Sequence, residues 1–174
     1  MTIRGAFFLA AALAMTVSAC SGDDDSTVSP TDFATAHSQD AHSVVVSVQE
    51  IEEGVGMLTG DSFNSPSALA SFDGVVNDAQ SSFDKVHNVL LEAAKPKGVE
   101  DGEVEMWSAT DELSHAMKSL RAYVDDQKPS DIADYKTHWD QGRAWWNQAV
   151  EKVWGETSIP APSIPNAPSA PPPT

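Results

Sequence analysis

A glutamate and a histidine three residues apart, Glu112 and His115, come nearest in this sequence to a known metal-binding spacing. Di-iron helical bundles use such a pair on each of two helices and a further Glu from each of the other two, all facing inward. Asp84 and His87 offer a second pair, with aspartate in place of glutamate. Because Leu113 marks the apolar side of its helix, His115 is expected about 160° away from the core, facing solvent. The sequence therefore predicts neither a metal site nor a cofactor.

Other catalytic patterns are absent from the sequence. It contains no Gly-x-Ser-x-Gly turn, no His-Glu-x-x-His motif, no glycine-rich phosphate loop and no cysteine pair that could attach haem. The 26 Asp and Glu residues are expected mainly on a solvated surface, and spacing alone assigns no pair of them a glycosidase role. His42 and His138 fit no ligand spacing and are expected at the surface as well. We therefore expect a protein that acts by binding and not by catalysis.

Four segments have the spacing of amphipathic helices, at about 30–58, 66–94, 103–124 and 131–154. In each, apolar side chains recur three and four residues apart, which places them on one face of a helix. The four stripes are Ala41, Val44, Val48, Ile51, Val55 and Leu58; Leu69, Phe72, Val76, Ala79, Phe83, Val86 and Leu90; Met106, Thr110, Leu113, Met117, Leu120 and Val124; and Ile132, Tyr135, Trp139, Gly142, Trp146, Ala149 and Val153. Prolines 30, 66, 96 and 129 all fall at predicted helix ends, where they avoid the roughly 3 kcal/mol cost of an interior position.

This pattern predicts an all-α fold, a single four-helix bundle of residues 29–156 with up-down-up-down topology. Short connections favour antiparallel neighbours. The ranges 20–28 and 157–174 are expected to be disordered, outside the core: the first is polar and acidic, and the second contains seven prolines. Two roles are open for 157–174, an arm that contacts a partner and a solubilising tail.

The middle of the predicted bundle holds a candidate pocket. Aligning the four stripes brings Gly142 into the central layer, where it costs its helix about 1 kcal/mol relative to alanine. Two interpretations are open: an indole leans across and fills the gap, as close-packed interiors favour, or a small apolar pocket remains. The pocket residues would be Val48, Ala79, Leu113, Gly142, Trp139, Trp146 and Thr110, with the threonine as the polar handle.

The amino-terminal residues have the build of a signal peptide, in which Arg4 precedes an apolar run over 6–17. About a dozen apolar residues are too few for a membrane-spanning helix, which takes roughly 20. The stretch Val17-Ser18-Ala19-Cys20 resembles the lipobox of bacterial lipoproteins, where a small-residue tripeptide precedes a cysteine that becomes the lipidated first residue. The resemblance implies removal of residues 1–19, a diacylglyceryl group on Cys20, and an extracytoplasmic protein anchored to the membrane.

Composition narrows the partners. The formal net charge of −16 repels nucleic acid and anionic headgroups, so the membrane would be reached through acyl chains alone. Cys20 is the only cysteine, which rules out an internal disulfide. The sequence predicts a monomeric lipoprotein, similar to many small bacterial lipoproteins of unassigned function. It would act as an interaction or scaffolding module for an envelope protein or wall polymer; the alternative is a small apolar-ligand binding protein.

Overall fold

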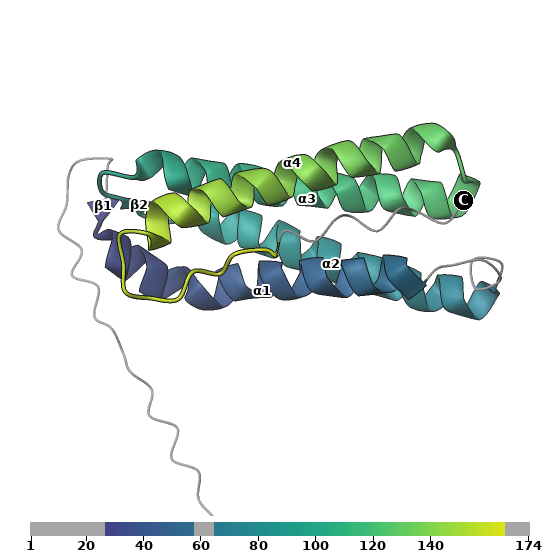
Figure 1. The fold of residues 1–174 in the computed structure, drawn as a ribbon, viewed down its shortest axis with the longest axis horizontal. Helices are drawn as coiled ribbons and strands as arrows, with labels where there is room; N and C mark the ends of the chain where they lie inside the picture. The colour runs from purple at the N-terminus through teal and green to yellow at the C-terminus, as the bar shows by residue number, and fades with distance from the viewer. Residues whose placement is uncertain (1–26, 58–64, 166–174) are drawn as a thin grey trace, which may run out of the picture.

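The computed structural model describes residues 27–57 and 65–165, which form the predicted four-helix bundle (Figure 1). The helices are α1 (Pro30–Met57), α2 (Pro66–Leu91), α3 (Glu100–Asp126) and α4 (Pro129–Trp154). Two short strands, β1 (Thr27–Val28) and β2 (Lys95–Pro96), pair in parallel at one end of the bundle. Within the described ranges, no helix is both long and apolar enough to cross a membrane.

Successive helices run antiparallel and pack side by side, so the topology is up-down-up-down (Figure 1). The most extensive interface joins α3 to α4, followed by those between α2 and α3 and between α1 and α2. The ring closes between α1 and α4, which meet over far fewer residues. The bundle therefore has three tightly packed sides and one open side.

The predicted apolar stripes form the core. The predicted stripe residues are buried, apart from Leu69, Val124 and Ile132, which are partly buried near helix ends, and Leu58, which lies outside the described residues. The largest fully buried side chains include the indoles of Trp139 and Trp146. This agreement follows from helical periodicity, because residues three and four apart share a face and the interior is the only place to remove that face from water.

The end of α2 and the start of α3 differ from prediction. The helix α2 ends at Leu91 rather than near 94, because the pairing of β2 with β1 holds Lys95–Pro96 in an extended conformation. Gly98 then turns the chain at a φ of +84°, and its N–H donates to the Glu100 carboxylate at 2.7 Å. Acidic side chains in the first turn of α3 favour a start at Glu100 rather than near 103, because they face the positive end of the helix dipole.

Both ranges that were predicted to be disordered, 20–28 and 157–174, contain ordered residues. Thr27–Val28, expected in the tether, forms β1, while residues 20–26 lie outside the described residues. Residues 157–165, expected outside the core, lie between α1 and α4 (Figure 1), and Ile164 is only 2% exposed. The prediction that the proline-rich range stays out of the core is therefore wrong for 157–165. Residues 166–174 lie outside the described residues.

Candidate functional site

The predicted pocket in the middle of the bundle is closed at Gly142. A Cβ atom added there would lie 2.8 Å from Leu113 Cγ and 3.1 Å from the Ala109 carbonyl oxygen. The Leu113 side chain of α3 therefore occupies the space. Of the two interpretations of the sequence, the filled gap is correct, but the group that fills it is a leucine and not a tryptophan indole. The polar handle is also engaged, because the Thr110 hydroxyl donates to the Trp107 carbonyl oxygen at 2.8 Å.

The other members of the predicted pocket are fully buried. Exposure is 0% for Val48, Ala79, Leu113, Trp139, Trp146 and Thr110. Val48, Ala79, Leu113, Trp139 and Trp146 belong to one hydrophobic core, in which Gly142 meets Leu113 across the α3–α4 interface. Gly142 thus allows two helices to approach closely, and the space above it is filled.

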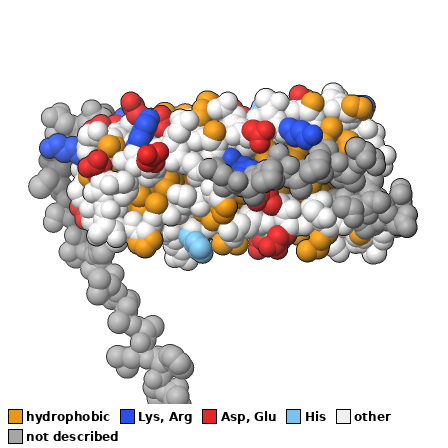
Figure 2. Space-filling model, viewed as in Figure 1, with side chains coloured by type: hydrophobic (Ala, Val, Ile, Leu, Met, Phe, Trp, Pro, Cys, Tyr) orange, Lys and Arg blue, Asp and Glu red, His pale blue; other side chains and the backbone are white. Residues whose placement is uncertain are grey.

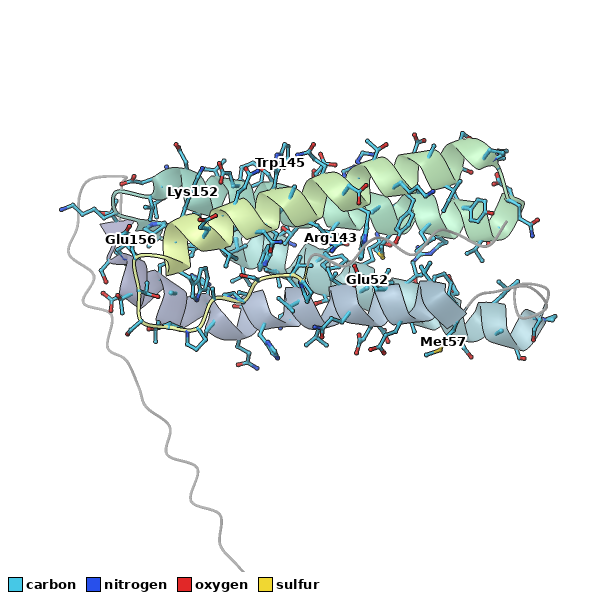
Figure 3. All side chains as sticks on the ribbon, in the orientation of Figure 1. Glu52, Met57, Arg143, Trp145, Lys152 and Glu156 are labelled. Atoms are coloured by element: carbon cyan, nitrogen blue, oxygen red, sulfur yellow. The ribbon has the colours of Figure 1, made fainter. Side chains whose placement is uncertain are left out.

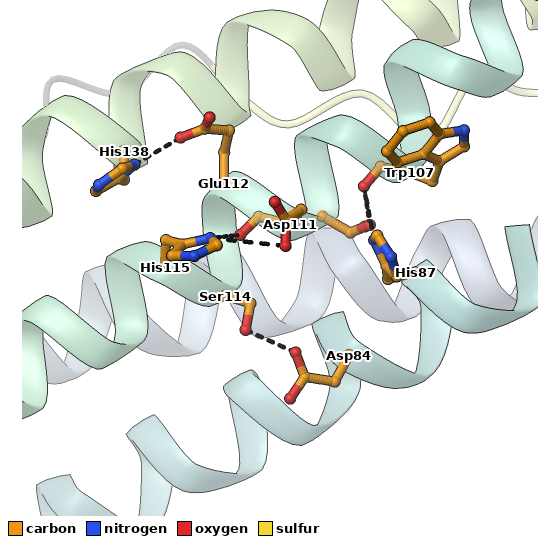
Figure 4. A network of polar contacts seen from close by, with 9 residues as sticks. Asp84, His87, Trp107, Asp111, Glu112, Ser114, His115 and His138 are labelled. Carbon is orange, nitrogen blue, oxygen red and sulfur yellow. Dashed lines mark hydrogen bonds and ion pairs between the residues drawn. The ribbon is translucent and has the colours of Figure 1, made fainter. Parts of the chain in front are cut away.

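The histidines and carboxylates singled out by spacing form contacts between helices and within α3 (Figure 4). His138 Nδ1 of α4 lies 2.6 Å from Glu112 Oε2 of α3, and the His138 and His115 ring centroids are 5.5 Å apart. His115 is about half exposed, with its Nδ1 2.9 Å from the Asp111 carbonyl oxygen. No three His, Cys, Asp or Glu side chains of the described residues are placed to hold a metal ion.

The second predicted pair, on α2, also contacts α3 (Figure 4). The Ser114 hydroxyl donates to Asp84 Oδ1 at 2.6 Å, and His87 Nδ1 lies 3.0 Å from the Trp107 carbonyl oxygen. These bonds join residues 20 to 30 positions apart in the sequence. Both contacts join α2 to α3.

A site is formed on the open side of the bundle, between α1 and α4, where the chain after α4 is bound. We call residues 157–165 the C-terminal segment. The α1–α4 groove is the surface beneath it, formed by Arg143, Trp146 and Asn147 of α4 and Glu52 of α1. After α4 the chain turns at the end that carries β1 and β2, and the segment runs back between α1 and α4 (Figure 1). The turn is fixed by the Thr157 N–H, which donates to the Trp154 carbonyl oxygen at 2.9 Å.

Two side chains of α4 bind the backbone of the C-terminal segment. The Trp146 indole N–H donates to the Pro162 carbonyl oxygen at 2.9 Å. Asn147 makes a reciprocal pair: its Nδ2 donates to the Ile164 carbonyl oxygen at 3.0 Å, and its Oδ1 accepts the Ile164 N–H at 2.8 Å. The buried indole therefore gains a hydrogen-bond partner, which a buried donor needs to avoid a desolvation cost of about 1–3 kcal/mol.

A buried ion pair lies beside the segment. Arg143 Nη1 of α4 and Glu52 Oε1 of α1 are 3.1 Å apart, and the side chains are 9% and 18% exposed. Figure 3 shows both side chains between the two helices. Arg143 also donates to the Pro165 carbonyl oxygen, so one guanidinium joins α1, α4 and the segment. Burial raises the pKa of the Glu52 carboxyl, and the positive charge of Arg143 opposes that shift.

The Tyr135 phenol is also affected by the charges of Glu52 and Arg143. Burial raises the pKa of Tyr135, and the negative charge of Glu52 adds to the shift. Tyr135 stays neutral at physiological pH. The groove therefore contains one compensated ion pair, between Arg143 and Glu52.

The acidic character of the surface is spread along the bundle. In the face seen in Figure 2, Asp and Glu side chains are scattered among apolar and uncharged ones and do not gather into one patch. The charge distribution therefore marks no separate binding surface on this face.

No protein-family model, curated protein or solved structure matches the chain. Spacing alone missed the groove, although the sequence carried two signals of it. Arg143 and Asn147 lie four residues apart beside the apolar stripe of α4, and isoleucine precedes proline twice in the C-terminal segment. Both become meaningful only when the chain is known to fold back along α4.

Proposed function

We propose that the chain is a lipoprotein of the cell envelope, anchored through Cys20, whose bundle is a non-catalytic interaction module that binds extended polypeptide. The observation that carries the binding role is the α1–α4 groove, where side chains of α4 hold the backbone of a non-helical segment. Hydrogen bonds to the main chain of a bound peptide are a recurring source of affinity in peptide recognition. The net charge of −16 favours a protein or wall polymer over nucleic acid as the partner.

The geometry of the bundle is compatible with such an anchor. The pairing of β1 with β2 holds Thr27–Val28 at one end, so acyl chains on Cys20 would attach the bundle by that end. Helices of 26 to 28 residues are about 40 Å long at 1.5 Å per residue. The long sides, including the α1–α4 groove, would then remain accessible from the aqueous phase.

The anchoring role is tested by Cys20→Ser. Each buried CH₂ of an acyl chain contributes about 0.8 kcal/mol, and stable attachment takes two chains. We expect the variant to leave the membrane fraction, while Ser21→Ala, a matched change at the next residue, stays there. An undiminished membrane fraction for Cys20→Ser would contradict the lipoprotein assignment.

The interaction role is tested by crosslinking in cells. A photoreactive residue at Glu151, which is exposed on α4 and lines the opening beside the C-terminal segment, should join the chain to an envelope component. The same residue at Gly74, which is exposed on α2 with no side-chain neighbour within 4 Å, serves as the control. Equal crosslinking at both positions, or none at Glu151, would count against a specific module.

The alternative, an apolar small-ligand site inside the bundle, is not favoured by any observation. This alternative places the pocket at Gly142, where the Leu113 side chain occupies the space.

A further inference from the structure

The contacts that hold the C-terminal segment are directed at its backbone. Arg143, Trp146 and Asn147 occupy positions i, i+3 and i+4 of α4, which places them on one face within a single helical turn. Together they bind three carbonyl oxygens and one N–H of the segment. Backbone groups are the same in every peptide, so these three side chains would bind any extended segment whose carbonyls fall in this register.

Side-chain selection is concentrated at one residue. Ile164 is the only fully buried side chain of the described segment, while Ala161, Ser163 and Pro165 are exposed. The following proline has a fixed φ and no N–H, which lowers the entropy cost of holding the chain extended. The sequence Ser-Ile-Pro occurs at 158–160 and again at 163–165. The contacts therefore favour a segment with isoleucine directly before proline, because the isoleucine is the side chain that the groove buries.

The segment fills the groove only in part. An opening of about 400 Å³ remains between the segment and the end of α4, lined by Trp154, Gly155 and Ile164 among others. The Trp154 indole N–H is buried and has no acceptor among the residues the structure describes. The chain's own segment thus leaves space beside it that a longer or bulkier occupant could use.

We propose that the α1–α4 groove is a binding site for an extended Ile-Pro segment of a partner protein, and that the C-terminal segment occupies it in competition with that partner. The proposal names the ligand class of the proposed interaction module and rests on it in that respect, but it does not depend on the lipid anchor. A tethered competitor acts at an effective concentration in the millimolar range for a short linker. The partner's apparent affinity is then its intrinsic affinity multiplied by the fraction of time that the groove is free of the segment.

The test uses a labelled peptide with the sequence of residues 157–165 and the full chain, measured by fluorescence anisotropy. Ile164→Asp should expel the chain's own segment, because a carboxylate cannot occupy the buried anchor position. We expect the peptide to bind this variant at least about tenfold more tightly than the wild type. The matched control is Ile159→Asp, the same change in the other Ser-Ile-Pro, where the isoleucine is only half-buried and binding should stay near the wild-type level.

A second substitution assigns the binding to the groove. Adding Asn147→Ala to Ile164→Asp removes the reciprocal pair of hydrogen bonds and should weaken peptide binding by about tenfold. A peptide that carries aspartate at the position of Ile164 should not bind either chain. If the folded Ile164→Asp chain, checked by circular dichroism, binds the peptide no better than the wild type, the proposal is overturned.

A measurement on the wild type keeps the proposal testable if Ile164→Asp fails to fold. Saturating peptide should displace the chain's own segment and increase the rate of proteolytic cleavage within 157–165 at least severalfold. An unchanged cleavage rate at saturation would overturn the proposal. A wild-type dimer that is lost in Asn147→Ala would also overturn it, because a second copy would then be the occupant. Each of these outcomes is independent of the membrane fraction of Cys20→Ser, so failure of the anchor and failure of the groove are distinguishable.

Discussion

The two sides of α4 are closed in different ways. Towards α3, Gly142 and Gly102 remove side chains from the interface, so that added Cβ atoms would lie 2.8 Å from Leu113 Cγ and 2.6 Å from Val153 Cγ2. Towards α1, the helices meet over few residues, and the C-terminal segment lies between them with Ile164 buried. One interface is close-packed and apolar; the other is held by polar side chains that bind a backbone.

The difference in packing suits the two interfaces to different roles. Close apolar packing fixes a unique arrangement, because any added volume must displace neighbours. Hydrogen bonds to a backbone can be exchanged for the same bonds to another backbone at little net change in free energy. The α3–α4 interface is therefore suited to hold the fold, and the α1–α4 groove is suited to exchange an occupant.

The largest expected effect is at the close-packed interface. Gly142→Leu places a branched side chain where even a Cβ is too close to Leu113. We therefore expect the unfolding free energy to fall by about 3 kcal/mol, the upper end of the usual range for an overpacked core. Urea denaturation measures it. The control is Gly74→Ala on α2, which has open space and should gain up to about 1 kcal/mol from helix propensity. A stable Gly142→Leu chain would mean that the interior at this level is open.

A smaller effect is expected when the groove is emptied. Deleting residues 157–174 removes the hydrogen bond to Trp146 and exposes the apolar surface covered by Ile164, at a cost of roughly 1–2 kcal/mol. The helical content measured by circular dichroism should be retained, because the helices and their apolar stripes lie before residue 157. Tryptophan emission should shift to the red. Loss of the helical signal would show that the segment is required for the fold itself.

Sequence periodicity predicted the packed side and missed the groove. The stripe through Trp139, Gly142 and Trp146 follows from a repeat of 3.6 residues, and each member is buried as expected. Helix ends were less predictable, because the pairing of β1 with β2 joins residues 68 positions apart and shortens α2. The contact of Glu112 with His138 and the placement of the C-terminal segment also depend on distant parts of the chain. Composition alone predicted that a proline-rich range stays outside the core, but the burial of Ile164 and the hydrogen bonds from α4 hold residues 157–165 against the bundle.

The smallest expected effect is a pH dependence near the start of α1. Burial lowers the pKa of His37, whose ring lies 4.6 Å from that of Phe33, while Asp40 opposes the shift. The neutral form is thus favoured in the folded state. Its stabilising contribution is present above the unfolded pKa of about 6.5 and is lost as the pH falls through the lower folded value. His37→Gln should therefore lose less unfolding free energy than the wild type between pH 7 and pH 5. Parallel pH profiles for the two chains would contradict this assignment.

The central claim, that α4 holds the C-terminal segment through its backbone, is tested most directly by amide hydrogen exchange at Ile164. Its N–H donates to Asn147 Oδ1 at 2.8 Å, so exchange in the full chain should be at least about tenfold slower than in a free peptide of residues 157–165. Asn147→Ala should remove that protection while leaving the Val86 amide in α2 unchanged. A wild-type Ile164 amide that exchanges at the rate of the free peptide would show that the segment does not occupy the groove, and would contradict the account.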